Sequence, residues 1–212
     1  PLDVEALLII ELDGPKVEVD ELIERVEKIA RACGSTTLQI SNSEQERLLF
    51  WSGRKAAFPA VGRLSPDYLC MDGTIPRGKL PEALAGIRDL SEKYGLRVAN
   101  VFHAGDGNIH PILLFDERNE DQVRRVLLAS DEILTKCLDL GGSVTGEHGI
   151  GVEKISFMDK LFAPEDLAVM KSIREVFNPD NRCSPGKMLP TAGGCGTESH
   201  PHQSHPGRRA AM

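Results

Sequence analysis

The segment His103-Ala-Gly-Asp-Gly-Asn-Ile-His110 constrains the fold of this chain more than any other. One apolar run leads into it and a second leads out of it. Between them lies Asp106-Gly107, the strongest short signal for a two-residue hairpin turn. With these two residues as the turn, His103 would stand directly opposite His110 on one face of an antiparallel pair, with Cβ atoms about 5 Å apart. The sequence therefore predicts a β-hairpin that presents two imidazoles together.

Two imidazoles at this separation can hold one metal ion, and Glu147 in the Gly-rich stretch 141–151 offers a carboxylate. Sets of two histidines and one carboxylate leave positions open for water or substrate, and they suit Zn, Mn or Fe. His103, His110 and Glu147 are therefore the candidate metal ligands. Neighbouring residues of an extended loop point to opposite sides, so His148 would face a substrate as a general base. A purely structural hairpin is the alternative at this point.

The composition indicates an ordinary globular protein. With 212 residues, 41% of them hydrophobic, the chain can bury one good core, and we expect one globular domain or two small ones. The net charge of −7 and the lack of a basic cluster argue against a nucleic-acid partner. Because the chain starts at Pro1 rather than at methionine, we expect a fragment or a processed chain.

Cysteine usage and hydropathy predict a cytoplasmic location. Five scattered cysteines without a CxxC pair read as reduced thiols rather than a disulfide framework. No apolar stretch approaches the ~20 residues of a membrane helix, and no signal peptide opens the chain. From 191 to 212 the sequence is rich in Gly, Ser, Pro and His without periodicity, so this tail is predicted to be disordered.

Hydrophobic periodicity predicts strands alternating with helices, followed by the hairpin. Strands are expected over 5–13, 36–40 and 67–75, and helices over 18–33, 43–58, 81–94, 120–140 and 164–177. Ser43 with Glu46 three residues later forms a capping-box signature. Pro81 suits a first helical turn, and Gly95 suits a helix end. This order predicts an α+β fold, an antiparallel sheet covered by helices on one face in a ferredoxin-like arrangement.

Three motifs in this order and spacing resemble one family. They are the hairpin segment, Gly146-Glu147-His148-Gly149-Ile150-Gly151, and the terminal Phe177-Asn178-Pro179 with Ser184-Pro185-Gly186-Lys187. The family is the flavin-linked 2-hydroxy-acid oxidases and dehydrogenases of the vanillyl-alcohol-oxidase type. Over residues 1–190 the chain resembles the C-terminal half of the FAD-binding subunits of bacterial glycolate oxidases. D-lactate and D-2-hydroxyglutarate dehydrogenases are similar, but the stretches 68–76 and 100–103 favour the glycolate-oxidase branch.

The resemblance implies the substrate- and metal-binding part of an FAD-dependent oxidoreductase. Such an enzyme oxidises a small 2-hydroxy acid, glycolate or D-lactate, to the 2-oxo acid. The family places a ferredoxin-like cap domain over its flavin, with Arg54 where the substrate carboxylate is held. Asn178 and Lys187 lie in the segment that returns toward FAD. Implied partners are an N-terminal FAD domain, an iron–sulfur subunit and a second copy in a homo-oligomer, in the cytoplasm or peripheral at the inner membrane.

FAD itself should be bound mainly by the N-terminal domain, because no GxGxxG fingerprint follows a strand in this chain. By itself the chain is therefore expected to be inactive and to bind no FAD.

The chain departs from the family pattern at three positions. The hydroxyglutarate enzymes carry lysine at Cys70 and asparagine at Ile112, and the loss of both polar groups favours a small substrate. Ser184 stands where the family usually has asparagine.

A stand-alone metallohydrolase and a noncatalytic binding module remain as alternatives, since two histidines and a glutamate also suit a zinc-bound water. Metal content separates the binding module from the two enzymes. An upstream flavin domain would separate the oxidoreductase from the hydrolase.

Overall fold

The computed structural model describes residues 4–190, and the chain divides into two compact units after Asp67. The tail over 191–212, predicted to be disordered, lies outside the described residues. No helix in the described part is both long and apolar enough to cross a membrane. The four cysteines in this part, Cys33, Cys70, Cys137 and Cys183, are free.

The first unit contains α1 (Lys16–Ala32), α2 (Glu44–Lys55) and α3 (Ala57–Val61). The capping signature is confirmed, because the Ser43 hydroxyl accepts a hydrogen bond from the Glu46 backbone N–H at the start of α2. The helix predicted over 43–58 instead breaks at Ala56, and α3 contains Pro59. Proline is tolerated there because residues in a first helical turn need no backbone N–H partner.

The strands predicted over 5–13 and 36–40 are wrong, since neither segment forms a strand in the described part of the chain. Leu7 and Leu8 are exposed rather than packed. An apolar run becomes a strand only when a neighbouring strand satisfies its backbone groups, and sequence pattern alone does not supply that neighbour.

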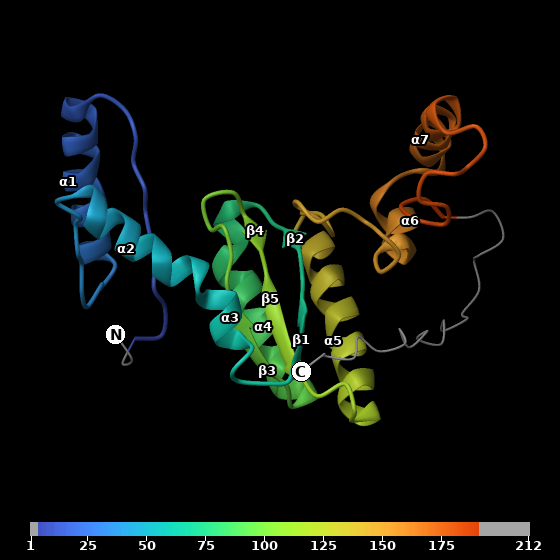
Figure 1. Ribbon diagram of the computed structural model, residues 1–212, viewed down its shortest axis with the longest axis horizontal. Coiled ribbons are helices and arrows are strands. Elements are labelled where there is room, and N and C mark those ends of the chain that lie inside the picture. Colours follow the sequence, from blue (N-terminus) through green and yellow to red (C-terminus); the bar gives the residue numbers. More distant parts are fainter. Residues whose placement is uncertain (1–3, 191–212) are drawn as a thin grey trace, which may run out of the picture. The chain divides into compact units, whose positions relative to one another are not determined.

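The second unit holds two small sheets (Figure 1). The three-stranded sheet has the order β1–β5–β3, formed by Asp67–Cys70, Pro111–Phe115 and Arg97–Asn100, and β3 and β5 are antiparallel. The second sheet pairs β2 (Gly73–Thr74) with β4 (Asn108–Ile109), also antiparallel. The single strand predicted over 67–75 is thus interrupted at Met71-Asp72, and its two halves join different sheets.

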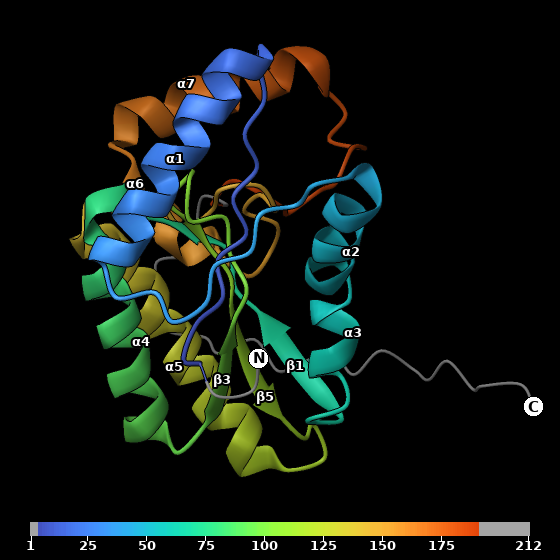
Figure 2. The same ribbon diagram turned by 90° about the vertical axis from the view of Figure 1, so that its left-hand side faces the viewer.

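Two long helices, α4 (Leu80–Tyr94) and α5 (Glu120–Asp139), pack together over one face of the three-stranded sheet (Figure 2). Ile87, Leu113 and Ile133 are among the buried residues of the core between these layers. Pro81 lies in the first turn of α4, and Gly95 ends it with a left-handed φ of 58°, as predicted.

Four further helical segments complete the second unit. They are two 3-10 turns (Arg77–Lys79 and Ile155–Phe157), the short α6 (Met158–Leu161) and the longer α7 (Pro164–Phe177). The predicted α+β class is confirmed, with seven α-helices and small antiparallel sheets in the described residues.

The hairpin forms, but its predicted register is wrong by two residues. His103 pairs with Asn108 rather than His110, and the loop between them has four residues, 104–107. Gly107 has a φ of 75°, and its carbonyl accepts a hydrogen bond from the Ile75 N–H at 2.9 Å, so contact with the β2 segment fixes the turn. A slip by two residues preserves the alternation of side chains, and both histidines therefore still share a face.

We predict that Gly107→Ala lowers the free energy of unfolding by about 2–4 kcal/mol. A Cβ there would lie 2.1 Å from the Ile75 carbonyl oxygen and would require a left-handed alanine. Gly105 in the same loop is the matched control, because its Cβ would meet no atom within 4 Å. Gly105→Ala should change stability by less than about 0.5 kcal/mol in urea unfolding. Equal losses for the two variants would contradict this account of the turn.

Candidate metal and catalytic site

The structure brings the three predicted metal ligands together. His103 and His110 come from the two sides of the hairpin, and Glu147 comes from the loop that follows α5. Each offers a ligand atom, and these atoms lie within 4.8 Å of one another. Glu147 Oε1 is 2.8 Å from His110 Nε2 and 3.8 Å from His103 Nε2.

The orientation of His110 is fixed by the backbone. Its side chain is 3% exposed, and Nδ1 lies 3.0 Å from the carbonyl oxygen of Met71. A carbonyl can only accept, so Nδ1 carries a proton, and a neutral His110 turns the lone pair of Nε2 toward Glu147. Two acceptors 2.8 Å apart repel each other unless a positive charge joins them. The arrangement therefore fits a shared proton or a metal ion, and the donor set is chemically suited to a divalent metal.

His148 lies beside this cluster. Its ring stacks on His110 with centroids 5.2 Å apart, and its Nε2 is 3.9 Å from Glu147 Oε1. The expectation that Glu147 and His148 point to opposite sides is therefore wrong. It assumed an extended loop, whereas the loop here curls around a buried carboxylate.

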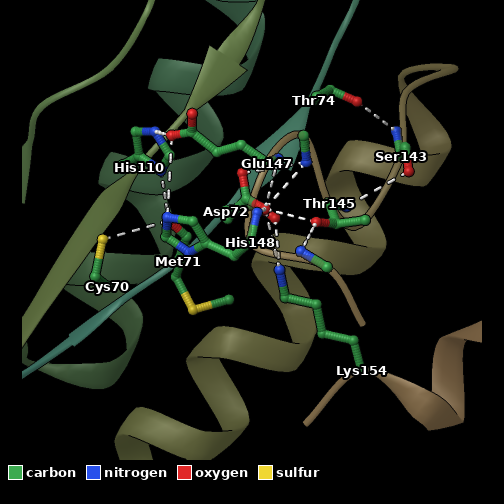
Figure 3. A network of polar contacts seen from close by, with 12 residues as sticks. Cys70, Met71, Asp72, Thr74, His110, Ser143, Thr145, Glu147, His148 and Lys154 are labelled. Atoms are coloured by element: carbon green, nitrogen blue, oxygen red, sulfur yellow. Dashed lines mark hydrogen bonds and ion pairs between the residues drawn. The ribbon is translucent and has the colours of Figure 1, made fainter. Parts of the chain in front are cut away.

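That carboxylate belongs to Asp72, which is fully buried in the break between β1 and β2 (Figure 3). It accepts hydrogen bonds from three consecutive backbone N–H groups, those of Gly146, Glu147 and His148, at 2.9–3.2 Å. The Thr145 hydroxyl donates to it at 2.6 Å and accepts from the Gly149 N–H at 2.8 Å. Asp72 thus sets the course of the loop that carries Glu147 and His148.

Asp72 remains ionised in this buried position. Burial acts to raise the pKa of its carboxyl, but hydrogen bonds from Thr145 and the loop N–H groups, with the nearby Lys154 ammonium, hold the pKa well below its ordinary range. Lys154 Nζ is 3.5 Å from the carboxylate and donates to the Asp72 backbone carbonyl at 2.9 Å. The charges of Asp72 and Lys154 therefore compensate each other inside the fold.

Sequence reasoning missed Asp72, Thr145 and Lys154 as parts of the site. The available signal was Asp72 itself, a carboxylate in an otherwise apolar run predicted to be a strand. A charge there requires either a break in the strand or a set of buried partners, and the structure has both.

A hollow of about 250 Å³ adjoins His148. It is lined by Cys70, Lys154, Lys187 and the loop over 149–153 as well. Burial raises the pKa of the Cys70 thiol, so this thiol stays uncharged at neutral pH. The predicted base and the predicted flavin-side Lys187 therefore border one space.

Two further predicted site residues are Arg54 and Asn178. Arg54 is on α2 in the first unit, and its role stays a prediction. Asn178 follows α7, and its amide donates to the Cys183 carbonyl and accepts from the Cys183 N–H. Asn178 thus shapes a turn, and its expected contact with a flavin also stays a prediction.

The comparisons with known proteins all point to one family. Residues 1–188 match the family described as FAD linked oxidases, C-terminal domain. The glycolate oxidase subunit GlcD of Escherichia coli K12 is 48% identical over 207 residues, covering 97% of this chain and 42% of that protein. The Bacillus subtilis subunit of the same name is 36% identical, over 89% of this chain and 40% of its own length.

More distant similarity extends to a mitochondrial D-lactate dehydrogenase [cytochrome] of Arabidopsis thaliana. It is 28% identical over 86% of this chain and 33% of its own length. The chain spans about two fifths of the length of the GlcD relatives.

We predict that Asp72→Asn lowers the free energy of unfolding by about 3–5 kcal/mol at pH 7, because it leaves the buried Lys154 ammonium without its anion. Urea unfolding measures this loss. Asp116→Asn is the matched control, since Asp116 pairs with the exposed Arg118 and its loss should shift the urea midpoint much less than Asp72→Asn does.

The loss at Asp72 should also depend on pH. The folded pKa of Asp72 lies below its unfolded value of about 3.9, so its stabilisation is complete above about pH 4 and declines as the pH falls further. Metal-free wild type and Asp72→Asn should therefore differ fully at pH 7 and less at pH 3. A difference that stays constant down to pH 3 would show that the charge of Asp72 is not what stabilises the loop.

Proposed function

We propose a function from one premise: the chain belongs to the C-terminal domain family of FAD-linked oxidases. It forms the substrate- and metal-binding part of an FAD-dependent oxidoreductase, which converts a small 2-hydroxy acid such as glycolate or D-lactate to the 2-oxo acid. The similarity to GlcD subunits supports this substrate class. The second unit, with α4 and α5 over one face of its sheet, would be the core of a ferredoxin-like cap domain within residues 1–190.

The contact between His110 and Glu147 supports the metal site most directly. A backbone-oriented imidazole faces a carboxylate oxygen at 2.8 Å, with His103 beside them, and the three would hold a divalent ion such as Zn, Mn or Fe. When bound, such an ion lowers the pKa of a hydroxyl group next to it. His110 then keeps Nε2 available because Met71 holds its other nitrogen.

His148 is the proposed general base. Its side chain is 48% exposed and borders the hollow, so it can take the proton from the substrate hydroxyl while remaining next to the ligand set. Arg54 is the proposed partner of the substrate carboxylate, which its planar guanidinium can bind through two hydrogen bonds.

FAD would accept the hydride, and an N-terminal domain would bind most of the FAD molecule. Asn178 and Lys187 would lie on the side of this chain that faces the FAD. Lys187 borders the same hollow as His148, which supports that placement. An iron–sulfur subunit and a homo-oligomer are further proposed partners. The site of action would be the cytoplasm or the periphery of the inner membrane, and the free cysteines in the described part are compatible with a reducing compartment.

The walls of the site suit a small substrate. Cys70 contributes an uncharged thiol to the hollow, and Ile112, two residues beyond His110 on β5, is completely buried. Neither of these two side chains offers a charged contact to the second carboxylate of a longer diacid. Family membership also favours the oxidoreductase over a metallohydrolase or a noncatalytic module.

Two substitutions in the complete FAD-containing enzyme test the division of roles. His148→Ala should reduce kcat by about 10²–10⁴ while bound metal stays at the wild-type level, because a base acts on the substrate rather than on the ion. His110→Ala should lose both metal and turnover. Metal analysis together with steady-state kinetics measures both effects.

Loss of metal in His148→Ala would make His148 a ligand and would leave Glu147 as the better candidate for the base. Full activity in metal-free enzyme would refute the metal-dependent proposal.

A further inference from the structure

Asn108 carries a buried polar atom that has no hydrogen-bond partner among residues 4–190. Asn108 is 7% exposed, and among the described residues its Oδ1 is the buried side-chain atom without a hydrogen bond. Such an acceptor loses its hydration without compensation, so native proteins rarely retain one unless a water, an ion or a ligand satisfies it.

The surrounding structure prevents this amide from turning away. A Cβ on Gly146 would lie 2.5 Å from Oδ1, 2.6 Å from Cγ and 2.8 Å from Nδ2, so the amide is packed against the loop backbone. The Asn108 backbone is fixed as well, because it pairs with Thr74 and its carbonyl accepts from the His103 N–H at 2.9 Å. The loop backbone at Gly146 therefore packs directly against the Asn108 amide.

The position of Asn108 connects this atom to the candidate metal ligands. Asn108 pairs with His103 across the hairpin, and His110 is two residues further along the same strand direction. Side chains two apart in extended chain share a face, whereas Ile109 between them is buried in the hydrophobic core. Gly146, against which the amide packs, directly precedes Glu147. Asn108 therefore pairs with one ligand residue, lies two positions from the second, and packs against the residue that precedes the third.

We propose that Asn108 is a fourth residue of this site, and that its amide oxygen accepts a hydrogen bond from an O–H group held beside the metal ion. This inference rests on the proposed metal-dependent function. A carbonyl oxygen can only accept, so the missing partner must be a donor. An O–H group next to a divalent ion is acidified and is a strong donor, whether it is a water or the hydroxyl of a 2-hydroxy acid.

Asn108→Leu in the full 212-residue chain tests the proposal, because leucine has a similar shape but no acceptor. The metal-free variant should unfold at an equal or higher urea concentration than wild type, since the uncompensated oxygen is gone. If the donor is a water beside the ion, the affinity for Zn²⁺ should fall about 10–100-fold, as it does when outer groups of metal sites are removed. A merely structural role for Asn108 would lower stability and leave both the Zn²⁺ affinity and the preference for glycolate unchanged.

Two further variants make the result specific. Asn108→Asp keeps an oxygen acceptor, so its Zn²⁺ affinity should equal or exceed that of wild type. If the leucine variant fails to fold, the Zn²⁺ affinity of Asn108→Asp still tests whether an acceptor at this position matters. His110→Ala keeps the three histidines at 200, 202 and 205, so its calorimetric titration gives the background from Zn²⁺ bound outside the site.

Titration of the Zn²⁺-loaded chain with glycolate and with acetate identifies the donor. If a water is the partner, Asn108→Leu weakens Zn²⁺ binding itself. If the substrate hydroxyl is the partner, Zn²⁺ binding is kept, and the preference for glycolate over acetate falls about tenfold.

Unchanged Zn²⁺ affinity together with an unchanged preference for glycolate would overturn the role of Asn108 alone. Wild-type chain that binds no more Zn²⁺ than His110→Ala would overturn the proposed metal site and this inference with it.

Discussion

The buried carboxylate of Asp72 is the interaction on which the candidate site depends. It lies where the chain passes from β1 to β2, and it binds the N–H groups of three successive loop residues. At the same break the Met71 carbonyl accepts a hydrogen bond from His110 Nδ1 and so orients the imidazole. One interruption of a strand therefore directs a histidine of the hairpin and a glutamate of a distant loop toward each other.

The polar groups of this site form two layers, an inner one around Asp72 and an outer one around His110. The charge of Asp72 is balanced by Lys154 and by hydrogen bonds, so the inner layer is complete within the protein. The outer layer is not, since a proton or a cation has to join His110 Nε2 to Glu147 Oε1 at 2.8 Å, and the Asn108 oxygen has no partner among the described residues. A satisfied inner layer that holds an electron-rich outer layer is the pattern expected of a preorganised cation site.

Local signals in the sequence predicted those elements that local chemistry determines. Ser43 with Glu46, Pro81 and Gly95 marked helix ends correctly, and the HxGDGNxH-type segment indicated that two histidines share a face. The hairpin register was missed because contact of Gly107 with Ile75 fixes the loop, and that contact is tertiary. Asp72 was missed for the same reason, since its partners lie about seventy residues away, beyond the reach of periodicity or spacing.

The central claim is that His103, His110 and Glu147 hold one metal ion, and anomalous X-ray diffraction from crystals of the Zn²⁺-loaded protein tests it most directly. The account predicts an anomalous peak with ligand distances of about 2.0–2.2 Å to both imidazoles and to the carboxylate. A fully loaded crystal without a peak at this position, with His110 and Glu147 still in direct contact, would mean that a proton joins them and would contradict the account.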